Sequence, residues 1–154
     1  MCDHPEATIE DALDNVRTII RKHGWAVKYV ENARAPWAYT IGLHVIGLPE
    51  LLVTGLEPAL AGSFLNHVAG VVMCGTPFAA GTRTTLEDGL LVETVEVEHP
   101  DAHMDFAIAI EGPQVTARQL VWADAHGRMP WDRRFDGGRS AQPVLGRRAT
   151  PRSG

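Results

Sequence analysis

Residues 25–56 decide the fold, and they read WAVKYVENARAPWAYTIGLHVIGLPELLVTGL. Apolar and polar side chains alternate in parts of this segment, with the period of two that is typical of β-strands. We therefore predict three strands, over Trp25–Glu31, Trp37–Leu43 and Glu50–Leu56. Asn, Gly and Pro residues between them predict a turn at 32–36 and an ordered loop at 44–49.

One amphipathic helix is predicted before these strands in the sequence, and another after them. Apolar residues recur at three- and four-residue spacing over Thr8–Arg21, Thr8 can cap the start, and Gly24 supplies a left-handed stop. Pro58 suits the first turn of a second helix, whose apolar stripe continues to about Cys74. These two segments are the main amphipathic helices that we expect.

The second half of the chain is predicted to contain mostly strands. We expect them over Thr82–Leu86, Leu90–Glu98, His103–Ile110 and Arg118–Ala123. An Asp-Gly turn favours a hairpin between the first two. Gly, Arg, Ser and Pro then dominate the end of the chain. The sequence therefore predicts a single α+β domain over residues 1–135, with a mostly antiparallel sheet, and a loosely ordered tail over residues 136–154.

Composition restricts the class of protein. The 154 residues fit one domain, and 45% hydrophobic residues can bury a core. A net charge of -5 disfavours nucleic-acid binding, which needs clustered Lys and Arg. No apolar stretch has the roughly 18–20 residues of a membrane helix, and the acidic start lacks the regions of a signal peptide. We expect a cytoplasmic protein without nucleic-acid or membrane partners, in which Cys2 and Cys74 stay reduced.

Tyr39, Thr40 and Glu50 form the first candidate site. A hydroxyl-rich strand that ends at Gly42 allows close approach of a ligand or another backbone. Partial desolvation of Glu50 at the start of an apolar strand would raise the pKa of its carboxyl and suit it to proton transfer. The structural alternative makes Tyr39 a core aromatic and Glu50 an acceptor of backbone hydrogen bonds.

Gln119, Trp122, Asp124 and Trp131 form the second candidate site. A Trp offers a flat apolar face with one N–H donor, and a Gln offers both a donor and acceptors. Together these side chains could hold a planar ligand. Alternatively, Trp122 and Trp131 pack across a hairpin that is closed at Asp124.

Cys2 and His4 form a third candidate site, for a transition metal. Removal of Met1 would leave a free amine on Cys2, and this amine, two amides and the His4 imidazole could surround Cu(II) or Ni(II) in tetragonal geometry. The Cys2 thiolate is also a candidate nucleophile or soft ligand. The structural alternative is a turn that precedes the first helix.

Four segments of the chain resemble one known family. They are CDHP at 2–5, HGWAV at 23–27, AYTIGL at 38–43 with LPEL at 48–51, and QLVWAD at 119–124 with GRMPWD at 127–132. Together they are similar to the bacterial family catalogued as domain of unknown function 4262, and the likeness covers nearly the whole chain. That family has no assigned function, so the resemblance implies no particular activity.

A binding module is the function that the residues favour first. Its pocket would lie near Tyr39, Glu50, Trp122 and Trp131 and take a small molecule or a protein partner. A small enzyme with Glu50 or Asp124 as general acid or base is the alternative, although His-Glu-x-x-His, Gly-x-Ser-x-Gly and phosphate-loop motifs are absent. A metal-binding protein built on the N-terminal Cys and His is the third. The strand-rich second half leaves sheet edges to protect, which favours a homodimer.

Overall fold

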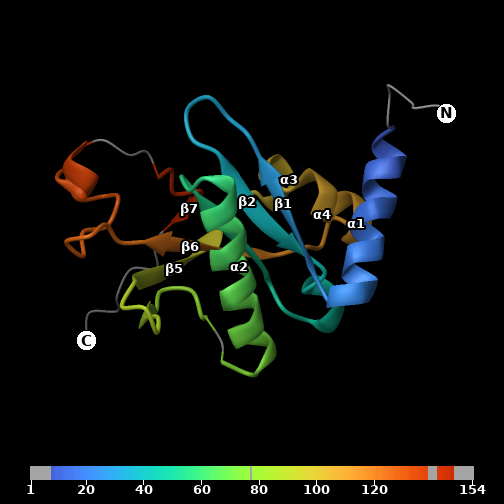
Figure 1. Ribbon diagram of the computed structural model, residues 1–154, viewed down its shortest axis with the longest axis horizontal. Helices are drawn as coiled ribbons and strands as arrows, with labels where there is room; N and C mark the ends of the chain where they lie inside the picture. The colour runs from blue at the N-terminus through green and yellow to red at the C-terminus, as the bar shows by residue number, and fades with distance from the viewer. Residues whose placement is uncertain (1–7, 77, 139–141, 148–154) are drawn as a thin grey trace.

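The computed structural model describes residues 8–76, 78–138 and 142–147, which form a sheet with helices on both faces (Figure 1). Its strands are β1 (Ala26–Val30), β2 (Trp37–Ile41), β3 (Glu50–Thr54), β4 (Arg83–Thr85), β5 (Leu91–Val97), β6 (Ala117–Trp122) and β7 (Gly146–Arg147). The order in space is β1-β2-β3-β6-β5-β4, and β7 pairs with β5. Neighbouring strands are antiparallel except β3 and β6, which are parallel. The predicted single-domain α+β fold with a mostly antiparallel sheet is confirmed.

Within the described residues, four α-helices and two 3₁₀ turns accompany the sheet. They are α1 (Ile9–His23), α2 (Pro58–Met73), α3 (Pro100–His103), α4 (Asp105–Glu111), η1 (His44–Ile46) and η2 (Phe135–Gly138). Reciprocal hydrogen bonds between Thr8 and Asp11 form a capping box at the start of α1. The Glu57 carboxylate caps α2 by accepting the Leu60 N–H at 2.8 Å. Both predicted main helices are therefore confirmed.

The alternation of side chains divides the core between the two faces of the sheet. On β2, Ala38 belongs to the cluster that packs against α2, and Tyr39 belongs to the cluster that packs against α1 and α4. On β3, Leu51 and Leu52 divide in the same way. Figure 1 shows α2 crossing one face, with α1, α3 and α4 on the other. The sheet is therefore covered by helices on both sides, and its central strands are buried.

The strand predicted over His103–Ile110 is wrong. This segment is helical, because α3 ends at His103 and α4 follows it directly. Met104, Phe106, Ile108 and Ile110 alternate with the period of a strand, which explains the prediction. The helical spacing of three is equally present, and Met104 and Ala107 use it to enter the core side by side. Tertiary packing therefore decides between two periods that the sequence leaves open.

Residues 142–147 lie in the stretch that we predicted to be loosely ordered, but they are packed against the sheet. Gln142 is buried, and Gly146 pairs with Val97 through β7. The Gly146 backbone also lies so close to the Glu96 carbonyl that no side chain fits there. These residues are held by hydrogen bonds to β5 and β6.

Candidate functional site

A cavity of about 330 Å³ lies between α2, the β4–β5 hairpin and β6. Most of its wall is apolar, and the lining residues are Leu56, Leu60, Ser63, Phe64, His67, Leu86, Asp88, Leu90 and Trp122. Its volume falls within the usual range for small-molecule sites, roughly 300–1,000 Å³. Leu60, which is 57% exposed, places a large apolar side chain where solvent can reach it. The cavity therefore offers an accessible apolar surface of the size that a small ligand needs.

Trp122 is held firmly on the cavity wall. Its indole N–H donates to the Thr54 carbonyl at 2.9 Å, and its ring packs at 5.4 Å against the Phe135 ring. The Gln142 amide bonds to both the N–H and the C=O of the Trp122 backbone, at 2.9 Å each. A half-buried indole fixed in this way presents a rigid aromatic face to the cavity.

Polar groups stand at a few places on the wall. Ser63 and His67 are one helical turn apart on α2, and both are exposed. Asp88 lies across the cavity in the hairpin turn, where its Oδ1 accepts the Leu90 N–H at 3.1 Å. An apolar wall with a few polar groups is the usual composition of a small-molecule site.

Glu50 is completely buried and accepts four hydrogen bonds. Oε1 accepts the Thr40 hydroxyl at 2.7 Å and the Leu43 N–H at 3.3 Å. Oε2 accepts the N–H groups of Gly42 and His44 at 3.0 Å each. The Glu50 carboxylate therefore fastens the loop after β2 to the start of β3, which is the structural role that we considered for it.

Glu111, at the end of α4, faces this carboxylate. Both of its carboxyl oxygens are buried. Burial, followed by the hydrogen bond and the negative charge of Glu50, raises the pKa of Glu111 to about 9, against the opposing N–H groups of Val45 and Gly42. A protonated Glu111 can donate a hydrogen bond to the carboxyl group of Glu50, so one proton can link the two groups.

Tyr39, Thr40 and Gln119 are also buried, in the centre of the sheet. The Tyr39 hydroxyl accepts the Phe106 N–H at 3.0 Å, and burial raises the pKa of Tyr39 to about 12 despite that bond. The Gln119 amide donates to Thr54 Oγ1 and to the Pro143 carbonyl, and it accepts the Leu145 N–H at 2.7 Å. These contacts hold neighbouring elements of the protein together.

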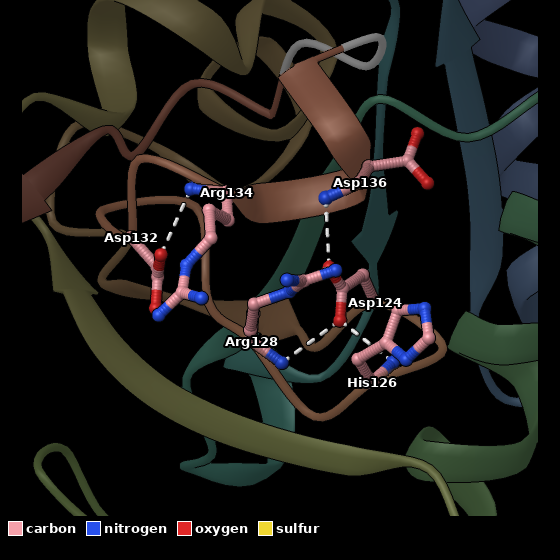
Figure 2. Close-up of polar contacts among 6 residues, drawn as sticks. All are labelled: Asp124, His126, Arg128, Asp132, Arg134 and Asp136. Carbon is pink, nitrogen blue, oxygen red and sulfur yellow. Dashed lines mark hydrogen bonds and ion pairs between the residues drawn. The ribbon is translucent and has the colours of Figure 1, made fainter.

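Asp124 organises the turn that follows β6 (Figure 2). Its Oδ1 accepts the N–H groups of His126 and Arg128 at 2.8 Å, and its Oδ2 accepts the Asp136 N–H at 2.7 Å and Arg128 Nε at 3.1 Å. Burial acts to raise the pKa of Asp124, but the N–H groups of Asp136, Arg128 and His126 and the Arg128 guanidinium outweigh it and hold the pKa well below its ordinary value. Nearby, Asp132 closes a smaller turn by accepting the Arg134 N–H at 2.8 Å.

The structure brings together only some of the residues that the sequence singles out. Trp122 lines the cavity, whereas Tyr39, Thr40, Glu50 and Gln119 lie in the interior. Trp131 is 38% exposed, and it is not among the residues that line this cavity. Cys2 and His4 lie outside the described residues.

Sequence reasoning did not find the cavity wall on α2 or the carboxyl of Glu111. Leu60 and Phe64 have the apolar spacing that is typical of the inward face of a helix, yet both line the cavity. Glu111 follows directly after the stretch that we took for a strand. Only the correct helix there would have placed it in the interior.

Two further classes of site find no support within residues 8–76, 78–138 and 142–147. No helix in this part of the chain combines the length and the apolar character needed to cross a membrane. The same residues contain no group of three or more His, Cys, Asp or Glu side chains that could hold a metal ion.

Comparison with known proteins identifies one family. Residues 19–136 match the family model described as Domain of unknown function (DUF4262). No curated protein and no solved structure matches the chain. The matched segment includes every residue of the cavity wall and both members of the Glu50–Glu111 pair.

Proposed function

The chain belongs to the DUF4262 family, which is defined without an activity, and we propose from its geometry that it is a small-molecule-binding module. The observation that carries the proposal is the apolar cavity of about 330 Å³ against the fixed indole of Trp122. A ligand with a ring could place it against Trp122 and Phe64, because aromatic faces give large apolar contact at little entropic cost. Leu60 and Leu90 would close over its sides.

A role for Glu50 or Asp124 as general base has less support. Each carboxylate accepts four hydrogen bonds from the protein and is nearly inaccessible to solvent. A base must reach the proton that it abstracts, directly or through one water. The homodimer, the metal at Cys2 and His4, and the cytoplasmic location remain predictions from the sequence.

Titration with a neutral fluorescent probe, N-phenyl-1-naphthylamine, tests the binding proposal. The wild-type protein should enhance its emission saturably, with one site per chain. Replacing Leu60 by Gln removes apolar contact from the wall and should weaken binding by about tenfold. Met73→Gln is the matched control, because Met73 is also an exposed apolar residue of α2 but does not line the cavity.

The two variants separate cavity binding from general adhesion to apolar surface. If Leu60→Gln binds the probe as well as the wild type, or if Met73→Gln weakens binding equally, the cavity is not the site. Circular dichroism spectra and urea midpoints of both variants should stay close to those of the wild type, since neither side chain belongs to the buried core.

A further inference from the structure

We infer that the ligand of this cavity is an organic cation, with a ring of aromatic size and one positive charge. The inference rests on the proposed binding function and adds the charge of the ligand to it. The residues that line the cavity include the acidic residue Asp88 and also His67, but no Lys or Arg. A negatively charged ligand would therefore meet an uncompensated carboxylate.

Asp88 is well placed to receive a positive charge. It is exposed, and its Oδ1 is held by the Leu90 N–H within the hairpin turn. The described residues include no Lys or Arg in an ion pair with Asp88. A ligand cation could thus approach the carboxylate without displacing a protein partner.

The start of α2 does not offer the usual attraction for an anion. Free N–H groups at a helix N-terminus favour anions. Here the Glu57 carboxylate already accepts the Leu60 N–H at 2.8 Å, and Pro58 has no N–H to offer. Leu60 belongs to the cavity wall, so the backbone N–H of this wall residue is already bound by a carboxylate.

Phe64 and Trp122 favour the same sign of charge. The face of an aromatic ring carries partial negative charge, and it attracts cations within about 6 Å, most strongly for Trp. A ligand cation that lies over one of these ring faces gains this attraction, and one that reaches the Asp88 carboxylate gains an ion pair. A neutral ligand would gain only apolar contact, and an anion would lose part of that gain to repulsion.

Three probes of nearly equal shape test the sign of the charge: 3-phenylpropylammonium, 3-phenylpropan-1-ol and 3-phenylpropanoate. Each is used to displace N-phenyl-1-naphthylamine from the 154-residue protein at pH 8. We expect the ammonium to bind about three- to tenfold more tightly than the alcohol, and the carboxylate to bind most weakly. Added NaCl should reduce the preference, because an exposed charge pair is screened.

Asp88→Asn tests the residue, since it removes the charge and keeps an oxygen that can accept the Leu90 N–H. It should bring the ammonium and the alcohol to within about twofold of each other, since the remaining preference comes from the rings. Glu10→Gln is the control for net charge, because Glu10 is an exposed residue of α1 on the opposite face of the sheet, and it should leave the preference unchanged.

The outcomes distinguish this inference from the function on which it rests. If the wild type binds alcohol and ammonium equally, prefers the carboxylate, or binds none of the three while still binding the naphthylamine, the cation inference is wrong and the cavity stands. A preference for ammonium that stays as large in Asp88→Asn as in the wild type also overturns it. If the naphthylamine itself fails to bind, or Leu60→Gln leaves its binding intact, the binding function fails first.

Discussion

At the scale of single residues, the proton on Glu111 has a measurable consequence. The pKa of Glu111 is raised from 4.5 to about 9 in the folded chain, so the folded protein holds a proton that the unfolded chain releases between these values. The contribution of protonated Glu111 to the stability of the folded protein is therefore fully present below pH 4.5 and is lost as the pH rises through 9. Glu111→Gln keeps an N–H donor for Glu50 but cannot titrate.

We therefore expect the stability difference between Glu111→Gln and the wild type to shift in favour of the variant from pH 5 to pH 9. Urea midpoints at pH 5, 7 and 9 measure it. The other titratable groups of the chain are present in both proteins, and their contributions largely cancel in the difference. Parallel pH profiles for the two proteins would show that Glu111 does not carry the proton.

Glu50→Gln tests whether the Glu50 carboxylate has a structural role or is held in a strained position for function. A Gln would replace one acceptor oxygen with an NH₂ group that faces N–H donors of the loop after β2. Leaving a buried donor unpaired costs about 1–3 kcal/mol, and we expect a loss of stability in that range. Urea unfolding at pH 7 measures it. An unchanged or increased stability would instead favour a functional role for Glu50.

At the scale of elements, Gly42 lies where the end of β2 meets the end of α1. Its φ is +123°, and a Cβ there would lie 2.9 Å from the Gly24 carbonyl oxygen. Gly42→Ala should cost about 1–3 kcal/mol in backbone strain alone, and the clash adds to this. Gly62→Ala is the matched control, because Gly62 lies in α2 with open space around it and should gain up to about 1 kcal/mol.

Thermal unfolding of these two variants gives the comparison. A Gly42→Ala protein as stable as the wild type would mean that the loop can move away from α1 at no cost. The same loop supplies the N–H groups that bind Glu50. Amide hydrogen exchange at residues 42–44 should therefore accelerate in Gly42→Ala and stay unchanged in Gly62→Ala.

The elements differ in how far the sequence determines them. β1, β2 and β3 were predictable because alternation, a Pro-containing turn and a Gly/Pro loop all favour the same three strands. The segment that forms α4 was not, because its apolar residues satisfy both the strand and the helix period. Only contact with the buried face of the sheet selects the helix.

At the scale of the whole molecule, Tyr39 and Gln119 lie on two strands of the sheet that are separated by β3. Tyr39 pairs with Leu52 across β2 and β3, and Leu52 pairs with Gln119 across β3 and β6. Their burial was not predictable, because it depends on helices that cover both faces of the sheet. The cavity forms where α2, the β4–β5 hairpin and β6 lie together, and no local sequence pattern predicts that arrangement.

The C-terminal segment, residues 142–147, is bound to the sheet in part by hydrogen bonds to Gln119. A thermodynamic cycle can measure the free energy of coupling between Gln119 and this segment. In the full chain, Gln119→Leu leaves the Leu145 N–H without its partner, whereas the Pro143 carbonyl loses one of two donors and keeps the Thr54 hydroxyl. We expect a loss of about 1–3 kcal/mol there. In a chain that ends at Gly138 those groups are absent, and Gln119 can be solvated, so the same substitution should cost much less. The coupling between Gln119 and the segment should therefore be about 1–2 kcal/mol.

Urea unfolding of the four proteins provides the coupling energy. Gln114→Leu serves as the control in both backgrounds, because Gln114 is exposed and the same substitution should be nearly neutral there. Equal costs of Gln119→Leu in the long and the short chain would show that residues 142–147 do not depend on this side chain. A positive coupling would instead mean that Gln119, which we first considered for ligand binding, serves to hold the segment whose Gln142 fixes the backbone of Trp122. Shortening the chain should then also weaken binding in the cavity, because the indole on its wall loses that support.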